Sequence, residues 1–567
     1  MEKRVLFAIF LSFLVLYVYQ AFVVKPVPKP AAATASNQAS TSTQAPAQTG
    51  GQIPTPTPSV PSAVVPPAQA AAPVAADASV TEPSERDVTV ETNDLIATFT
   101  NRGGRLKSLR LKKYLDPATK QPQQLVEAIP NQPLPFSLQT SNEPATRTLN
   151  GALYASNVSG TDAKFEYRDG SVHALKQFHF DATSYMISVT ATVEENGKKV
   201  TPSIVWGPAV GDAAEVSRYT QPPEAIVDRL DASKPDRLAT KDLAKQSVYD
   251  GEFRFAGVDD NYFMTVALAP GPSKVSFQSI TLPVPEGSKA TPRTLVAYSI
   301  EPHGDHPIKF FVGPKDFDVL AGIGPDMTRA INFGVFAVIV VPLLRSLKWV
   351  HGFIGNWGWS IVLLTVIINA IMFPLRHKSA VSMRKMQEIQ PQVKAIQDRY
   401  AKFKASDPQK QNMNKELMEL YKQRGVNPAA GCVPMLLTFP VLFAMWALLQ
   451  TSIELRGAPW FGWIHDLSSH DPWYVLPVLM GGTSFWQQKM MPAAGGDPAQ
   501  QKMMMFMPLF MMFIFLWLPA GALIYYVVTN IWTIGQQYLT NYLIGPPNVR
   551  TVRPPAERRL KRATNEQ

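Results

Sequence analysis

The chain contains a single cysteine, Cys432, among 567 residues, which excludes an internal disulfide framework and any cysteine-rich metal site. Its eight histidines are scattered, and none forms the i,i+4 pair typical of a helical zinc site. No P-loop, G-x-S-x-G or H-E-x-x-H pattern is present. We therefore predict a protein that has no metal, no cofactor and no covalent catalytic step.

Charged side chains are also absent from the middle of five long apolar runs in the carboxyl-terminal part of the chain. A segment that spans a bilayer must satisfy every backbone polar group internally, so apolar runs of this length are typical of membrane helices. We predict a five-helix core over 357–543, with spans at 357–375, 429–452, 473–489, 503–518 and 520–543.

A sixth apolar run, Val5–Val24, follows Lys3 and Arg4 at the amino terminus. It exceeds the usual core of a cleavable signal peptide and offers a poor small-x-small cleavage site. We therefore predict an uncleaved transmembrane anchor over 1–24, with the amino terminus in the cytoplasm. Residues 25–85 are rich in Pro, Ala, Thr and Ser, and this composition predicts a disordered linker.

Period-two alternation begins at Asp87, in stretches such as Leu95–Thr100 and Met186–Val193. Asp169-Gly170 and Asn196-Gly197 are dipeptides that favour tight hairpin turns. We predict an antiparallel β-sandwich domain over 86–320. Because it follows an anchor that crosses the membrane once, we expect it outside the cytoplasm.

Ile331–Leu344 is apolar but short, and Arg345 and Lys348 follow it. Apolar runs of this length are more often interfacial or buried than spanning. If it spanned, the insertion between the first two core spans would face outward although it carries 12 basic and 5 acidic residues between Arg376 and Arg424. We therefore predict an interfacial amphipathic helix within 325–348.

This arrangement places the basic insertion, 376–426, and the basic tail, 544–567, in the cytoplasm, as the positive-inside tendency requires. The same placement accounts for the formal net charge of +10 without a nucleic acid partner, because the basic residues cluster beside apolar runs. We expect no specific DNA binding.

The insertion predicts a helical hairpin. Its first helix carries an apolar stripe at spacings of three and four, which includes Met386, Ile389, Val393 and Tyr400. Asp407-Pro408 is a suitable N-cap and N1 pair for a second helix. The stripe fits either a coiled-coil spacer or a docking arm, and the spacing alone favours the spacer.

Uncharged polar side chains lie at mid-depth in two spans. Thr365 and Asn369 are one turn apart on the first core span, and the last span carries Tyr526, Thr529, Asn530 and Thr533 on one arc. Such residues can simply form hydrogen bonds between helices, each worth about 0.6–2 kcal/mol in membranes. Two polar arcs at matching depth favour a hydrated groove instead.

Many short motifs in one order resemble a known family, the YidC membrane protein insertases of Gram-negative bacteria. The residues that carry the resemblance include Trp357-Gly358-Trp359-Ser360, Gln390-Pro391, Asn427-Pro428, Pro440, Glu454-Leu455-Arg456, Trp463-Ile464-His465-Asp466-Leu467, Gln488-Lys489-Met490, Phe506-Met507-Pro508 and Tyr525-Tyr526. The order of anchor, linker and β-domain is similar as well.

The resemblance implies an insertase and assembly chaperone of the bacterial inner membrane. In that family a hydrophilic groove, open to the cytoplasm and to lipid, receives nascent membrane proteins, alone or with the Sec translocon. The resemblance also implies contacts with lipids, the ribosome and the signal-recognition targeting machinery. It further implies that the β-domain is periplasmic and that the hairpin stripe contacts substrate or targeting machinery. We place Arg376 at the groove entrance because of its position at the cytoplasmic end of the first core span.

One position departs from the family pattern. The family usually has an arginine one turn after the threonine that corresponds to Thr365, and this chain has Asn369. An amide offers neutral hydrogen bonds in place of a permanent charge, so the sequence predicts a groove that depends little on charge. A transporter or channel would require pore-lining charges or interrupted helices in a repeated half, and neither is present.

Overall fold

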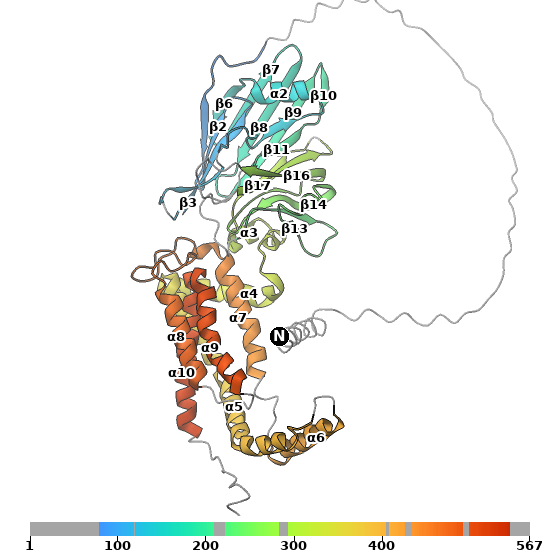
Figure 1. Ribbon diagram of the computed structural model, residues 1–567. Coiled ribbons are helices and arrows are strands. Elements are labelled where there is room, and N and C mark those ends of the chain that lie inside the picture. The colour runs from blue at the N-terminus through green and yellow to red at the C-terminus, as the bar shows by residue number, and fades with distance from the viewer. Residues whose placement is uncertain are drawn as a thin grey trace, which may run out of the picture. The chain divides into compact units, whose positions relative to one another are not determined.

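The structure is a computed structural model, and it describes residues 79–544 except 118, 127, 209–220, 283–292, 305, 404–406, 426–432 and 491–497. These residues belong to one compact unit that contains a β-domain and a helical part (Figure 1). The predicted anchor at 1–24, nearly all of the predicted linker at 25–85 and the tail beyond 544 lie outside the described residues.

The smaller sheet of the β-domain is an antiparallel meander of four strands. Its order is β1 (Asp87–Glu91), β2 (Leu95–Thr100), β3 (Arg105–Leu115) and β4 (Pro122–Val126). Strand β2 shows why the alternation predicts a strand, because Leu95, Ala97 and Phe99 are all fully buried on one face.

The larger sheet contains fourteen of the described strands, all paired antiparallel. Its main path is β5 (Ser137–Gln139), β11 (Ser203–Trp206), β17 (Arg293–Pro302), β16 (Pro272–Leu282), β14 (Val248–Asp259), β15 (Phe263–Leu268), β18 (Ile308–Pro314), β9 (Met186–Glu195), β8 (Val172–Phe180), β7 (Asp162–Arg168) and β6 (Ala155–Ser159). Strands β10 (Lys198–Val200), β12 (Glu224–Arg229) and β13 (Asp236–Leu238) pair beside this path.

The two sheets face each other across an aromatic core, which confirms the predicted antiparallel sandwich. The Phe99 ring of the smaller sheet lies 4.8 Å from Phe178 and 5.4 Å from Phe165 of the larger one, measured between ring centroids. Both predicted hairpins are present, and Asn196 and Gly197 have φ values of 50° and 74°. Positive φ at both central residues is the geometry that Asn-Gly turns favour.

A buried ion cluster ties the β-domain to the segment that leads into the helices. The Asp259 carboxylate is fully buried and accepts hydrogen bonds from Arg237 at 2.6 Å and from Lys315 at 2.8 Å. Arg237 also donates to the carbonyl of Ala330, at the end of the 3-10 helix η1 (Pro325–Ala330). The cluster therefore fixes η1 against strands β13 and β14.

The helical part follows, after two short helices that belong to the β-domain side, α2 (Glu143–Gly151) and α3 (Phe317–Ile323). It consists of α4 (Ala337–Ile354), α5 (Trp357–Arg399), α6 (Pro408–Gln423), α7 (Val433–Thr451), α8 (Val475–Met490), α9 (Pro498–Ile514) and α10 (Ala520–Ile544), with short 3-10 turns η2 (Gly334–Phe336), η4 (Ile453–Leu455) and η5 (Phe515–Trp517).

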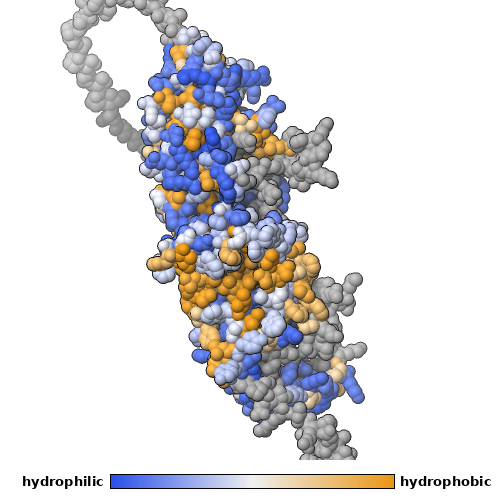
Figure 2. All heavy atoms as spheres, turned by 90° about the vertical axis from the view of Figure 1, so that its left-hand side faces the viewer, coloured by the Kyte–Doolittle hydropathy of each residue, from blue (hydrophilic) through white to orange (hydrophobic). Residues whose placement is uncertain are grey.

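Within the described residues, two helical segments are long and apolar enough to cross a membrane, Gly334–Ile354 and Trp357–Met386. Thr438–Thr451 and Met505–Trp517 are apolar but shorter. On the face shown in Figure 2, hydrophobic residues gather over the helical part, while the β-domain surface is mostly hydrophilic. An exposed apolar surface of this kind marks contact with a membrane or a partner.

Helix α4 contains most of the segment for which we predict an interfacial position. Val340, Leu344 and Leu347 are buried at spacings of four and three, while Val338 and Phe353 are 85% and 75% exposed. Both faces of this helix are therefore apolar, and the exposed face suits lipid better than water. Gly334–Ile354 is also long and apolar enough to cross a membrane, so the interfacial position of this helix stays a prediction.

Helix α5 is one continuous helix that carries both the first predicted core span and the first arm of the hairpin. Its distal half packs against α6 around Ile389 and Val393, which contact Leu417 and Leu420. Helix α6 begins as predicted, because the Asp407 side chain accepts from the backbone N–H of Gln409 and Pro408 occupies the first turn.

The turn after α7 binds the β-domain through Arg456. Its guanidinium donates to the carbonyl of Leu115 at 3.0 Å and to the amide oxygen of Gln123 at 2.7 Å, and it lies 5.2 Å from the centroid of Phe263. Two residues earlier, Glu454 pairs with Lys348 of α4 at 2.6 Å. Burial raises the pKa of the Glu454 carboxyl in spite of this attraction.

Replacing Arg456 with methionine is expected to loosen this contact, because it removes two hydrogen bonds and a cation–π contact worth about 1–3 kcal/mol together. Hydrogen exchange on the full chain should then show about tenfold faster exchange around Leu115 and η4. Arg456→Lys, which keeps the charge over the ring, is the matched control with a smaller effect. Unchanged exchange in Arg456→Met would show that the contact contributes nothing to docking.

Candidate functional site

Thr365 and Asn369 lie on α5, which packs against α10, and both side chains are almost completely buried. The Thr365 hydroxyl donates to the carbonyl of Ile361 at 2.6 Å, and the Asn369 amide donates to the carbonyl of Thr365 at 2.8 Å. Each donor is therefore satisfied within its own helix. The amide oxygen of Asn369 accepts a hydrogen bond from Arg376 of the same helix.

The polar residues predicted on α10 point toward two different helices, Thr533 toward α5 and Asn530 toward α8. The Thr533 hydroxyl donates to the carbonyl of Thr529 at 2.7 Å. Asn530 turns toward α8, where its amide donates to Ser484 at 2.7 Å and to Thr483 at 3.1 Å. Thr483 and Ser484 are not among the predicted residues, although two adjacent hydroxyl side chains in the middle of an apolar helix are a signal of such a contact.

Tyr526, the remaining α10 residue of the arc, is partly buried. Its ring lies 5.6 Å from Phe515 and 5.7 Å from Tyr525, measured between centroids. Arg376 links Asn369 of α5 to Thr533 of α10, and these two residues are bonded to the carbonyls of Thr365 and Thr529 in their own helices. Asn530 instead turns toward α8. We call the set Thr365, Asn369, Arg376, Thr529 and Thr533 the polar seam.

Arg376 joins the two sides of the seam. Its guanidinium Nη1 donates to the amide oxygen of Asn369 at 2.8 Å and makes a longer contact of 3.4 Å with the hydroxyl of Thr533. The Cα atom of Arg376 lies seven residues after that of Asn369, which is about 10 Å along the helix axis. Long side chains on helices lean toward the amino-terminal end, so the head group lies nearer mid-helix than its Cα.

Polar contacts continue along the same two helices beyond Arg376. His377 lies 3.4 Å from the Thr540 hydroxyl, and Arg384 donates to the Asn541 amide oxygen at 2.6 Å. Near the seam, the amide oxygen of Gln536 is buried without a protein hydrogen-bond partner. A buried acceptor of this kind normally binds water or a ligand group.

The four side chains that we predict as contacts for substrate or targeting machinery take part in packing within the hairpin itself. Ile389 and Val393 contact residues of α6, and Met386 packs against the same cluster. The Tyr400 hydroxyl donates to the Glu416 carboxylate at 2.8 Å. That hydrogen bond raises the pKa of Tyr400. This arrangement suits a packed spacer, and only the outer surface of the hairpin remains for a partner.

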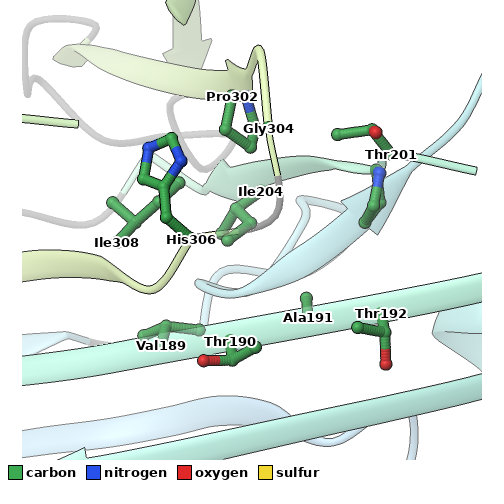
Figure 3. Close-up of a pocket in the computed structure, with 11 residues that line it drawn as sticks. Val189, Thr190, Ala191, Thr192, Thr201, Ile204, Pro302, Gly304, His306 and Ile308 are labelled. Carbon is green, nitrogen blue, oxygen red and sulfur yellow. The ribbon is translucent and has the colours of Figure 1, made fainter. Parts of the chain in front are cut away.

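A small pocket in the β-domain is a second candidate site (Figure 3). It is lined by Val189, Thr190, Ala191, Thr192, Thr201, Pro202, Ile204, Pro302, Gly304, His306 and Ile308. The one titratable side chain in this lining, His306, lies 2.5 Å from the carbonyl of Pro270 through Nε2. In the described part of the chain, no group of three or more His, Cys, Asp or Glu side chains is placed to hold a metal ion.

Comparison with known proteins gives the family. The family model described as 60Kd inner membrane protein matches residues 349–545, and the YidC periplasmic domain model matches residues 87–346. A membrane protein insertase YidC from Pelobacter propionicus is 34% identical, over 96% of this chain and 100% of the relative. The chain belongs to the YidC family. It is thus an inner membrane protein with a periplasmic β-rich domain, and its relatives are named insertases, which carry out no enzymatic reaction.

A second YidC relative, from Syntrophus aciditrophicus, is 33% identical over 95% of this chain and 99% of its own length. Among solved structures, an active YidC insertase with its first transmembrane domain resolved covers 82% of this chain and 95% of that chain. Its sequence identity is 19% and its TM-score 0.34. Family membership therefore rests on the sequence matches.

Proposed function

We propose that this protein inserts nascent membrane proteins into the inner membrane and assists their assembly, with the polar seam as the floor of a hydrophilic groove. The observation that carries the proposal is the set of polar side chains between α5 and α10, within helices whose outer surfaces are apolar. The groove would be open to the cytoplasm and to lipid.

The physical reason is the cost of moving polar groups through hydrocarbon. Each unpaired amide or hydroxyl costs about 2–7 kcal/mol in an apolar environment. Side chains and water halfway across lower that cost for the polar end of a substrate. Burial of the substrate's apolar segment of roughly 20 residues, together with the membrane potential, then drives insertion without a nucleotide.

The proposed partners follow from the same scheme. The hairpin of α5 and α6 would be the first contact for substrate or for the signal-recognition machinery, and the basic tail at 544–567 would contact the ribosome. The protein would act alone on small substrates and with the Sec translocon on larger ones. A total of six spans and the cytoplasmic position of the hairpin are part of this proposal.

The test is reconstitution of the purified full chain, alone, into liposomes with a substrate that has one or two membrane spans. We expect insertion above the level of protein-free liposomes, measured as protection of the substrate from added protease. Absence of insertion without the translocon would overturn autonomous activity.

A further inference from the structure

Toward the β-domain, the polar seam gives way to aliphatic side chains. Ile361 of α5 lies one turn before Thr365, and its carbonyl accepts the hydrogen bond of the Thr365 hydroxyl at 2.6 Å. The side chain of Ile361 is fully buried, as are those of Leu455 in η4 and Leu467 in the loop that follows η4. We call Ile361, Leu455 and Leu467 the outer plug.

The outer plug meets the first turn of α10 at Gly521. A methyl group placed on Gly521 would lie 3.4 Å from Cδ1 of Ile361, 3.7 Å from Cδ1 of Leu455 and 3.2 Å from the carbonyl oxygen of Leu467. All three residues of the outer plug therefore surround one point of the α10 backbone. Glycine at this position allows their close approach, because it has no side chain of its own.

Hydrogen bonds fasten the loop that carries Leu467 to the same turn of α10. The backbone N–H groups of Ala520 and Gly521 donate to the carbonyls of Ser469 and Leu467, at 2.7 and 2.9 Å. Ala520 and Gly521 are the first residues of α10, and the first N–H groups of a helix have no acceptor within it. The loop therefore satisfies two donors that a membrane interior would leave unpaired.

Asp466 holds this loop in shape. One oxygen of its carboxylate accepts from the backbone N–H of Gly457 at 2.9 Å and from that of Ser468 at 2.8 Å. The other oxygen accepts from the Ser469 hydroxyl at 2.8 Å. The two ends of the loop are thus joined through one side chain.

Leu455 lies between two residues that are anchored outside the outer plug. Glu454 pairs with Lys348 of α4 at 2.6 Å. Arg456 donates to the carbonyl of Leu115 and to the side chain of Gln123, both in the β-domain. The position of Leu455 therefore depends on the contact between η4 and the β-domain.

We infer that the outer plug closes the polar seam on the β-domain side as a barrier to water and ions, and that the β-domain holds this barrier in place through Arg456. The inference rests on the proposed function, because a groove that is hydrated to mid-membrane would otherwise conduct ions. Hydrophobic constrictions exclude water, and ions do not pass where water is excluded. The β-domain thereby contributes to insertion as the anchor of a barrier.

The first test measures proton influx into liposomes that contain the full chain and an enclosed pH-sensitive dye, after a step in external pH. Leu455→Asn is expected to raise the influx about fivefold or more over the unmodified protein, because an amide in the outer plug binds water. Leu455→Met keeps an apolar side chain of similar volume, so it is the matched control and should stay as tight as the unmodified protein. Substrate insertion by each variant shows that the variant is folded.

Arg456→Met tests the part of the β-domain in the same assay. It should raise the influx about twofold, since the outer plug stays apolar but loses an anchor, and Arg456→Lys should raise it less. An influx unchanged by Arg456→Met would overturn the anchoring role. An influx unchanged by Leu455→Asn, in a variant that still inserts substrate, would overturn the barrier.

A second measurement does not depend on the folding of Leu455→Asn. In a Cys432→Ser background, Ile361→Cys should resist a membrane-impermeant maleimide from either side of the membrane, whereas Thr533→Cys should react from the hairpin side. Both should react after denaturation. Reaction of Ile361→Cys in the folded protein would overturn the barrier and leave the hydrated seam standing. Failure of Thr533→Cys to react would instead overturn the hydrated seam, and the proposed groove with it.

Discussion

Asn369→Leu is expected to lower the insertion rate of polar-tailed substrates roughly tenfold or more in liposomes. Leucine has a similar volume but no amide, so the guanidinium of Arg376 loses its 2.8 Å acceptor and lies beside an apolar side chain. Loss of a hydrogen bond to a charged group costs about 1.5–3 kcal/mol, which corresponds to about 10- to 150-fold in rate if it acts on the transition state.

Thr365→Val, one helical turn before Asn369 on α5, is the control for Asn369→Leu. The Thr365 hydroxyl already donates to a carbonyl of its own helix, so its removal should cost less than about 1 kcal/mol. Ile371→Leu changes a residue that is 74% exposed, and it should have no effect. If Asn369→Leu inserts substrates as fast as the unmodified protein, the polar seam is not on the insertion path.

Asp259→Ala is expected to destabilise the β-domain by about 3–5 kcal/mol. The substitution leaves Lys315, which is only 3% exposed, without the carboxylate that it contacts at 2.8 Å. Removing one partner of a buried pair is costly because the other charge stays buried and uncompensated. Hydrogen exchange of the central amides of β14 and β15 should accelerate by about 100- to 4,000-fold.

The double variant Asp259→Leu with Lys315→Met separates the cause from simple loss of packing. It removes both buried charges, and such replacements are often neutral or stabilising. We expect it to recover most of the lost protection. A double variant as unstable as Asp259→Ala would show that the pair does not account for the effect, since Arg237 would then be the main partner of Asp259.

The sequence predicts the β-domain well because its signals are local. Alternation in β2 and β9 follows directly from one buried face, and Asn196-Gly197 requires only its own two residues to form a turn. Sheet order is different, since β18 pairs with β9 across more than a hundred residues of sequence. No local pattern encodes that pairing, so the order of the strands in the sheet cannot be predicted from the sequence.

The helical part was predicted less completely, for a physical reason visible at Arg376. From the sequence we predict this residue at the groove entrance, because its Cα lies beyond the end of the apolar run. Its head group bonds two turns back, to Asn369. The spacing of seven residues, combined with the direction in which helical side chains lean, is the signal that could have revealed it.

The continuity of α5 was also not predicted. Pro374 and Pro391 both lie inside this helix, and proline usually interrupts the hydrogen-bond ladder. In α5 the helix extends through both positions to Arg399, so that the seam and the hairpin belong to one element.

The most direct test of the central claim is site-specific photocrosslinking to a stalled nascent membrane protein. A photoreactive residue at position 533 lies on the seam, and one at position 531 replaces Ile531, which is 56% exposed on the other side of α10. The account predicts crosslinks from 533 to the polar tail of the substrate and none from 531 to that tail. Equal crosslinking of the tail from both positions, or crosslinking from 531 alone, would contradict a path along the polar seam.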